Sequence, residues 1–408
     1  MNILYIAYSC MPDKGSEEKI GWNIPLESAK KNNVFVVTKE EHRPVIEEYL
    51  RSHNIENPKF FFVDINGIYK KFFKGALYSI RLNLWHKQAY PIVKDICEKE
   101  HIDIIHQITP VEFRSIGNYG GIDNVKFICG PVGGAEPLPE GLRCYAKGNL
   151  TIERLRSFLN KWSKLRYNKT GTLRKCDYML FVNKETQAYL SDSIDDVPHS
   201  LYPEIGVNEG EIICGKEAAK NRSEIVFLVA GRLVYRKGHS FLFDVLKELP
   251  PDIKYTCRIV GDGPERSRLD AKCRACGLQD KVVFTGRLRY EEVAKEYNNA
   301  DVFIMPSIRE TTGTVLVEAI SKGLPVITIN RFGGSVLLDD SCAYFYDGNS
   351  TQEIKDGLKQ AIVSAVSDIS RGAVSSALIT EKSKQHLWEN KLRYYNSLYN
   401  KILYNRNN

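Results

Sequence analysis

The chain has 408 residues, more than a single hydrophobic core usually spans, so two domains of about 200 residues are expected. Hydrophobic residues make up 43% of the chain and aromatic residues 11%, which is typical of a well-packed globular protein and excludes a disordered or fibrous one. The formal net charge is +7, but no nucleic-acid-binding motif accompanies the basic residues, so nucleic acid is not an expected partner.

Ten cysteines are scattered along the chain, and only Cys273 and Cys276 form a C-x-x-C pair. A zinc site of this type needs a second pair, so the isolated thiols fit a reducing compartment better. The first apolar run, residues 3–7, is too short for a signal peptide. No apolar run approaches the about 18 residues of a membrane span. These features predict a cytoplasmic protein.

The first half alternates short apolar runs with helical stretches. Strands are predicted at 3–7, 34–37, 60–63, 102–106, 125–129 and 178–182. Gly15 and Ser16 open the helix after the first strand, where their backbone can approach a phosphate or an acceptor group. His106 is predicted to end the fourth strand and to present a ring nitrogen to a ligand, although a lone histidine there is more often structural.

A polar run at 198–222 is the predicted linker to the second half. Strands are predicted there at 225–230, 255–260, 281–284, 302–305 and 325–329, and a long aromatic-rich helix at 382–404. Strands separated by about 10–15 helical residues predict parallel, doubly wound sheets. We therefore expect an α/β protein with domains at 1–203 and 204–381, the final helix packing back on the first domain.

Two glutamates flank the start of a helix predicted at 313–322. Glu310 lies in the loop before it, and Glu318 interrupts an apolar run within it. Free N–H groups at Gly313, Thr314 and Val315, with the positive end of the helix dipole, suit an anion. Hydroxyl-binding carboxylates on either side of an anion site fit a nucleotide sugar. For Glu318 alone, a solvated or internally paired side chain is an equally good interpretation.

Two cations frame the loop after the strand at 225–230, in the sequence GRLVYRKG. Arg232 and Lys237 can bind a diphosphate, Arg232 as a fork and Lys237 as a point charge, although exposed surface cations would look the same. No two aspartates are separated by a single residue, so a D-x-D metal motif is missing. The loop VGDGPE lacks the third glycine of a dinucleotide fingerprint, which disfavours an NAD enzyme.

In order along the chain, GRLVYRKG, VGDGPE, VVFTGRL, ADVFIMPS and the E-x7-E stretch resemble the motifs of glycosyltransferase family 4. The resemblance is dense at 225–330 and looser in the first half, through the Gly15-Ser16 loop, DIIHQ and GPVGG. It implies the GT-B fold, two Rossmann-like domains that face a cleft. It also implies a retaining transferase that needs neither metal nor another cofactor.

The resemblance further implies roles for individual residues. Arg232 and Lys237, with the backbone of residues 313–315, would hold the donor diphosphate and stabilise it as it leaves. Glu310 would contact the donor sugar and Glu318 the ribose. His106 would lie near the transferred sugar, and Gly15 and Ser16 would complete the donor site.

The implied donor is a UDP- or GDP-linked sugar, and the implied acceptor is a glycan or lipid-linked saccharide of cell-surface polysaccharide synthesis. A sugar-nucleotide epimerase and a non-catalytic binding subunit remain alternatives. A glycosidase is less compatible, because its paired carboxylates would face each other across a bond instead of flanking an anion site.

Two basic stretches stand out in the first half. Residues 65–94 contain no acid, and residues 147–175 contain nine basic residues and one acid, Glu153. Both are rich in aromatic residues or leucine. They predict a basic amphipathic surface for an anionic membrane, with solvated helix faces as the alternative.

Overall fold

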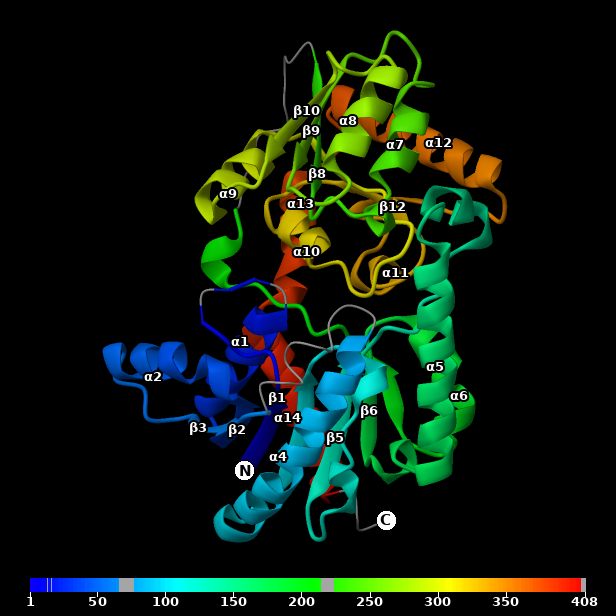
Figure 1. Cartoon of the computed structure of the whole chain (residues 1–408). Coiled ribbons are helices and arrows are strands. Elements are labelled where there is room, and N and C mark those ends of the chain that lie inside the picture. Colours follow the sequence, from blue (N-terminus) through cyan, green and yellow to red (C-terminus); the bar gives the residue numbers. More distant parts are fainter. Residues whose placement is uncertain (13, 16, 66–76, 214–223, 405–408) are drawn as a thin grey trace. The chain divides into compact units, whose positions relative to one another are not determined.

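The computed structural model describes residues 1–12, 14–15, 17–65, 77–213 and 224–404 (Figure 1). The chain forms two compact units, each described here by itself. Unit 1 comprises Met1–Ala135, Ile152–Gly206 and Trp388–Asn408, and unit 2 comprises Glu136–Thr151 and Val207–Leu387. Among the described residues, no helix combines the length and the apolar character needed to cross a bilayer.

Unit 1 is built on a seven-stranded parallel sheet with the order β3-β2-β1-β4-β5-β6-β7. Its strands are β1 (Asn2–Ala7), β2 (Asn33–Lys39), β3 (Lys59–Val63), β4 (Ile104–Thr109), β5 (Lys126–Val132), β6 (Tyr178–Phe181) and β7 (His199–Leu201). Its main helices are α1 (Glu17–Ala29), α2 (Arg43–Ser52), α4 (Tyr78–Glu100), α5 (Leu150–Thr170), α6 (Lys184–Ile194) and α14 (Trp388–Tyr404).

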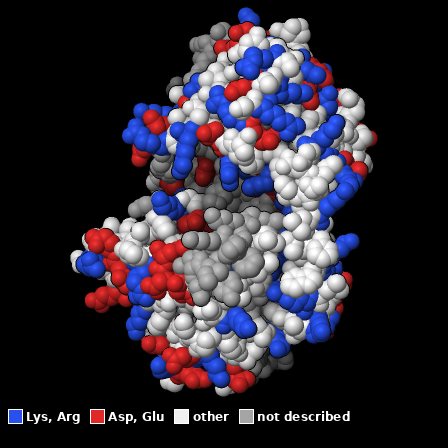
Figure 2. Space-filling model, in the orientation of Figure 1, with Lys and Arg blue, Asp and Glu red and all other residues white. Residues whose placement is uncertain are grey.

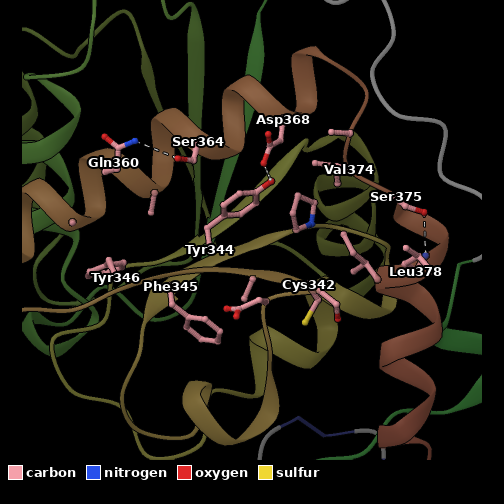
Figure 3. A pocket seen from close by; sticks show the side chains of 18 of the residues that line it. Cys342, Tyr344, Phe345, Tyr346, Gln360, Ser364, Asp368, Val374, Ser375 and Leu378 are labelled. Carbon is pink, nitrogen blue, oxygen red and sulfur yellow. Dashed lines mark hydrogen bonds between the residues drawn. The ribbon is translucent and has the colours of Figure 1, made fainter.

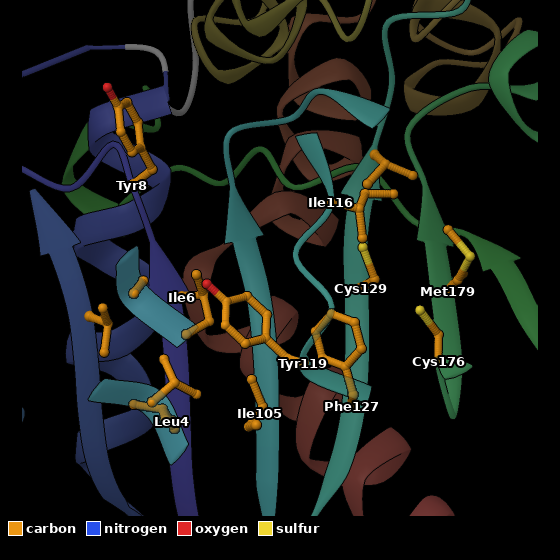
Figure 4. Close-up of a cluster of buried hydrophobic side chains, with 14 of the residues drawn as sticks. Leu4, Ile6, Tyr8, Ile105, Ile116, Tyr119, Phe127, Cys129, Cys176 and Met179 are labelled. Carbon is orange, nitrogen blue, oxygen red and sulfur yellow. The ribbon is translucent and has the colours of Figure 1, made fainter. Parts of the chain in front are cut away.

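Both faces of this sheet are buried, which explains why its strands are continuous apolar runs. Leu4, Ile6, Ile105 and Phe127 pack on one face, in the core that α4, α5 and α6 complete (Figure 4). The alternate residues of the same strands pack on the other face, against α1, α2 and α14. The C-terminal helix therefore belongs to the core of unit 1.

His106 lies inside β4, on the face that α14 covers, and is 0% exposed. Its Nε2 lies 2.7 Å from the Gly130 carbonyl, which can only accept, so Nε2 carries the proton. Its Nδ1 accepts from the Tyr399 hydroxyl at 2.6 Å. Burial lowers the pKa of His106 to about 4. The prediction that His106 offers a ring nitrogen to a ligand is therefore wrong: β4 continues to Thr109, which places the imidazole in the core.

Unit 2 contains a six-stranded parallel sheet with the order β10-β9-β8-β11-β12-β13. Its strands are β8 (Ile225–Ala230), β9 (Tyr255–Val260), β10 (Val282–Gly286), β11 (Val302–Met305), β12 (Val326–Ile329) and β13 (Ala343–Tyr346). Its helices include α7 (His239–Leu246), α8 (Arg266–Ala275), α9 (Tyr290–Asn299), α10 (Thr314–Ser321), α11 (Gly334–Leu337), α12 (Thr351–Ser370) and α13 (Ser376–Ser383).

The strand order reverses at β8, which has β9 on one side and β11 on the other. This is the topological switch point of a doubly wound sheet, where ligands bind beyond the carboxyl ends of the strands. In unit 1 the corresponding point lies between β1 and β4. The site of unit 2 is therefore expected at the loops that follow β8 and β11.

The predicted domain boundaries need one correction. Residues 136–151 were assigned to the first domain, but they belong to unit 2. There Leu142 and Ala146 pack in the core with residues of α7 and α12. The stretch is rich in proline and glycine and has no strand-like or long helical pattern, so the sequence did not reveal this exchange. The predicted final helix also begins later, at Trp388 instead of 382.

The buried Tyr399 hydroxyl yields a test of this packing. It contacts both His106 Nδ1 and the Tyr5 hydroxyl, the latter at 3.2 Å. We expect Tyr399→Phe to lower the free energy of unfolding of unit 1 by about 1–3 kcal/mol, because it leaves a buried acceptor unpaired. Urea unfolding measures this, with Tyr404→Phe as the control, since Tyr404 is 71% exposed. Equal midpoints for the two variants would contradict the assignment.

Candidate functional site

The loops after β8 and β11 are packed together at the switch point of unit 2. Gly238 ends the first loop with a φ of +71°, a conformation that favours glycine. A Cβ at Gly238 would lie 1.9 Å from the Pro306 carbonyl oxygen in the second loop. Two further hydrogen bonds, from the N–H groups of Ile308 and Arg309 to the Arg236 carbonyl, join the same loops. The side chains that these loops carry are therefore held side by side.

Glu310 lies at the centre of this junction and is 8% exposed. Its Oε2 forms an ion pair with Lys237 Nζ and accepts from the Ser307 hydroxyl at 3.3 Å. Its Oε1 lies 3.5 Å from the Arg236 guanidinium and accepts from the Thr311 N–H at 3.3 Å. The carboxylate is thus held by four residues. Ser307 and Thr311 come from its own loop, and Lys237 and Arg236 come from the loop after β8.

The charge state of Glu310 follows from these contacts. Burial alone would raise the pKa of its carboxyl, but the charges of Lys237 and Arg236 and the hydrogen bonds from Lys237 and Thr311 outweigh it. The pKa is lowered to about 2. Glu310 is therefore an ionised anchor for Lys237 and is poorly suited to accept a proton near neutral pH.

Arg232 and Lys237 come from the same loop but differ in their contacts. Lys237 is held by Glu310, and its side chain lies along Gly231, where an added Cβ would be 3.6 Å from Lys237 Cε. Arg232 is exposed, and its guanidinium has no hydrogen bond or ion pair with the residues that the structure describes. The loop therefore carries one anchored cation and one that is open to solvent.

The helix predicted after Glu310 is present as α10, with Gly313 as its N-cap in the left-handed region at φ +87°. The first N–H groups of a helix have no intrahelical acceptor, so those at Thr314 and Val315 can donate to an anion. Glu318 is half-buried on the same helix, and its Oε2 accepts from the Tyr297 hydroxyl of α9 at 3.1 Å. An internal partner, one of the two interpretations of Glu318, is therefore present.

Two neighbours of this site were not predicted from the sequence. Arg236 lies next to Lys237 and contacts Glu310. Nothing in the sequence GRLVYRKG distinguished it from an ordinary surface cation. Glu136 comes from the exchanged stretch 136–151, is fully buried, and accepts from the Thr311 hydroxyl at 3.5 Å. No sequence signal links Glu136 to a loop 175 residues away.

The remaining predicted site residues lie elsewhere. Gly15 is an exposed residue of unit 1, and Ser16 lies outside the described residues. His106 is in the core of unit 1, as described above. Among the described residues, no group of three or more His, Cys, Asp and Glu side chains could hold a metal ion.

A separate pocket of about 700 Å³ lies beside the edge strand β13 (Figure 3). The side chains of β13, α12 and α13 line it, and the Tyr344 hydroxyl donates to Asp368 across it at 2.9 Å. None of the predicted donor-binding residues lines this pocket. It is thus distinct from the site at the carboxyl ends of β8 and β11.

The anchored Glu310 predicts a pH-dependent stability. Its folded pKa of about 2 lies below the ordinary value of 4.5, so its contribution is complete above pH 4.5 and is lost as the pH falls through about 2. Glu310→Gln should remove a contribution of up to about 3 kcal/mol at pH 7. The difference from wild type should shrink in acid, as measured by denaturant unfolding of unit 2.

Glu291→Gln is the matched control, since Glu291 is an exposed glutamate of the same unit. A difference between wild type and Glu310→Gln that stays constant between pH 7 and acid would show that the Glu310 carboxylate is not held by the two cations.

Comparison with solved structures identifies the fold. Sucrose-phosphate synthase from Thermosynechococcus elongatus superimposes with a TM-score of 0.68 at 18% identity, over 98% of both chains. Anabaena Alr3699/HepE in complex with UDP superimposes with a TM-score of 0.62 at 17% identity, over 98% of this chain and 100% of that one. At these identities the likeness concerns the fold alone, and it confirms the predicted GT-B class.

Comparison of sequences finds a family match for part of the chain. Residues 215–368 match the model of the family described as glycosyl transferases group 1. The GDP-mannose-dependent alpha-(1-6)-phosphatidylinositol monomannoside mannosyltransferase of Mycobacterium tuberculosis is 29% identical over 158 residues, which are 36% of this chain and 41% of that protein. The chain matches only about a third of the length of the first curated relatives. Residues 215–368 are thus similar to the glycosyl transferases group 1 family, and the chain has the GT-B fold.

Proposed function

We propose that the protein is a retaining glycosyltransferase that transfers a sugar from a nucleotide diphosphate sugar to a glycan or lipid-linked saccharide. One observation carries the proposal. At the switch point of a group 1 domain, one loop supplies Arg232 and Lys237, and the next supplies Glu310 and the N-terminus of α10. This set matches a diphosphate flanked by hydroxyl groups.

The donor would lie along α10. Its diphosphate would accept hydrogen bonds from the N–H groups of Thr314 and Val315 and contact Arg232 and Lys237. Glu318 lies further along the helix, roughly 6 Å from Thr314 at a rise of about 1.5 Å per residue, and would accept from the ribose hydroxyls. UDP is bound by a protein of the same fold, and a sequence relative is named for its use of GDP-mannose, so both nucleotides are candidates.

In the reaction, these residues would stabilise negative charge. When the bond between the anomeric carbon and the diphosphate oxygen breaks, negative charge develops on the diphosphate. Lys237 and Arg232 would stabilise this charge without a metal ion. Glu310 acts as a positioning residue, because its ion pair fixes the Lys237 ammonium before the reaction and avoids a costly reorganisation during it.

For the acceptor we infer a class of molecule and not a single compound. One relative is named for transfer to a phosphatidylinositol mannoside, a saccharide on a lipid. We infer a cytoplasmic enzyme of cell-surface polysaccharide synthesis, whose acceptor is a glycan or lipid-linked saccharide.

Incubation with UDP- and GDP-linked sugars, in buffer containing EDTA, tests the activity. Release of free nucleoside diphosphate is expected, with undiminished rate in EDTA because two side-chain cations neutralise the diphosphate. Appearance of an epimeric sugar nucleotide would show an epimerase, and binding without turnover a non-catalytic subunit. A strict need for Mg²⁺ or Mn²⁺ would contradict the metal-free mechanism.

Removal of either cation should mainly lower turnover. We expect Lys237→Ala and Arg232→Ala each to reduce the rate by about two decades, roughly 3 kcal/mol, and the double variant to lose less than the sum. Arg289→Ala is the control, because Arg289 is an exposed arginine of the same unit. Thermal unfolding separates lost catalysis from lost stability, since Lys237→Ala also removes the closer of the two cations that contact Glu310. Near-wild-type kinetics in either variant would refute the donor-site assignment.

Glu318 and Glu310 should separate binding from transfer. Glu318→Ala should weaken the affinity for the nucleoside diphosphate alone, measured by calorimetry, whereas Glu310→Ala should leave that affinity nearly intact and reduce transfer. Tyr297→Phe removes the internal hydrogen bond to Glu318, keeps its carboxylate, and should preserve most of the affinity. The reverse pattern would mean that the donor lies in the opposite direction along α10.

A further inference from the structure

Helix α5 has an inverted distribution of polar and apolar residues. The side chains that it buries within the protein are polar or amphipathic: Glu153, Asn160, Ser163 and Tyr167. The large hydrophobic side chains point outward, with exposed fractions of 48% for Ile152, 42% for Leu155, 65% for Phe158, 51% for Trp162 and 67% for Leu165. A helix whose only task was to cover the sheet would have the opposite pattern.

These five residues form one continuous face, defined here as the α5 face. They follow each other at intervals of three or four residues, which places them on one side of a helix. At a rise of about 1.5 Å per residue, the face is roughly 20 Å long. It holds five of the ten large hydrophobic side chains that are exposed among the described residues. An apolar patch of this kind marks an interaction surface.

Basic side chains border the α5 face. Arg154, Lys161 and Lys169 are exposed and have no ion pair with the described residues. The guanidinium of Arg166 lies 5.6 Å from the Trp162 ring centre. The only acid of the helix, Glu153, is buried on the opposite side. In Figure 2 the surface over α5 is accordingly mostly white with blue side chains beside it.

A pocket continues this surface between α4 and α5. It has a volume of about 540 Å³, and its lining contains Lys87 and Arg166 but no acid. His86, which is 5% exposed, also lines it, and its Nδ1 lies 2.9 Å from the Tyr119 hydroxyl. A pocket that carries two cations and no acid fits an acidic headgroup.

We propose that the α5 face docks the protein on an anionic lipid bilayer. The apolar side chains would enter the boundary between headgroups and acyl chains, and the bordering cations would contact anionic headgroups. A second copy of the chain fits less well, because packing two α5 faces together would oppose unpaired cations. The link to a lipid-linked acceptor rests on the proposed function, but the docking itself does not.

The other basic stretch, residues 65–94, differs from α5 in the part that the structure describes. Residues 66–76 lie outside the described residues, so their predicted part in membrane binding is not addressed by the structure. From Tyr78 onward the stretch is α4, whose Leu82, Trp85, Ala89 and Val93 are buried in the core. The described part of 65–94 therefore packs inward, and α5 is the element with the exposed apolar face.

Tryptophan fluorescence of the full chain tests the docking. Of the four tryptophans only Trp162 is exposed, since Trp22, Trp85 and Trp388 are at most 5% exposed. Added vesicles of phosphatidylcholine and phosphatidylglycerol should shift its emission to shorter wavelength and protect it from acrylamide, and pure phosphatidylcholine should not. High salt should reverse the shift. Trp162→Phe should abolish the signal while cosedimentation persists. An unchanged Trp162 spectrum with anionic vesicles would overturn the proposal.

Two pairs of variants separate the apolar from the electrostatic contribution. Phe158→Gln with Leu165→Gln should weaken vesicle binding at least about tenfold, whereas Leu378→Gln, at a 66% exposed leucine of unit 2, should not. Lys161→Gln with Lys169→Gln should weaken it about tenfold or more. Arg51→Gln with Lys99→Gln, which removes two exposed cations that are already paired with acids, should have little effect.

Thermal unfolding without vesicles keeps this test independent of the proposed activity. The Phe158→Gln, Leu165→Gln protein should unfold at the same temperature as wild type, which shows that it is folded. Wild-type vesicle binding by this variant would overturn the proposal. A second result would also overturn it: light scattering that shows a dimer for wild type and a monomer for this variant, when neither protein binds vesicles.

Discussion

A carboxylate buried beside two cations is the interaction on which the organisation of unit 2 depends. Glu310 has little access to water, so its charge is tolerated only because Lys237, Arg236 and two hydrogen-bond donors surround it. Removal of Lys237 or Arg236 would leave the Glu310 charge only partly compensated in a low-dielectric environment. The pair therefore fixes the relation of two loops that are 73 residues apart in sequence. A ligand that approaches them meets a lysine whose position is already set.

The strand order makes this meeting possible. In a parallel sheet all carboxyl ends lie on one edge, and at a switch point the connections on either side run in opposite directions. The loops after β8 and β11 therefore have no crossing helix between them, and close approach at Gly238 brings their backbones into contact. The chemistry of the site thus follows from topology first and from side chains second. This explains why short, individually weak motifs predict the site when they occur in the correct order.

Sequence patterns predicted those features that depend on local or periodic information. The strands at 225–230 and 255–260 have the predicted bounds, because each is a mainly apolar run that ends at a glycine-containing loop. The edge strands β7 and β13 were missed, since β7 has only three residues and β13, with the sequence AYFY, lacks the Val and Ile residues that mark β11 and β12. His106 was misplaced because the end of a buried strand is hard to locate: three further residues put its ring in the core. The contact of Glu136 with Thr311 depends on a chain exchange that no local pattern encodes.

The contrast between α4 and α5 shows why composition alone does not locate a surface. Both helices come from basic, aromatic-rich stretches, and both alternate apolar and polar residues at helical spacing. In α4 the apolar side faces the sheet, where Trp85 donates to the Val63 carbonyl at 3.1 Å. In α5 the buried Tyr167 bonds to the Phe113 carbonyl and the Ile116 N–H, both at 2.8 Å, which fixes the helix with its polar side inward. These two hydrogen bonds satisfy the buried Tyr167 hydroxyl and hold this side of α5 against the core. The apolar side of α5 lies outward, and its residues are available to bind a partner.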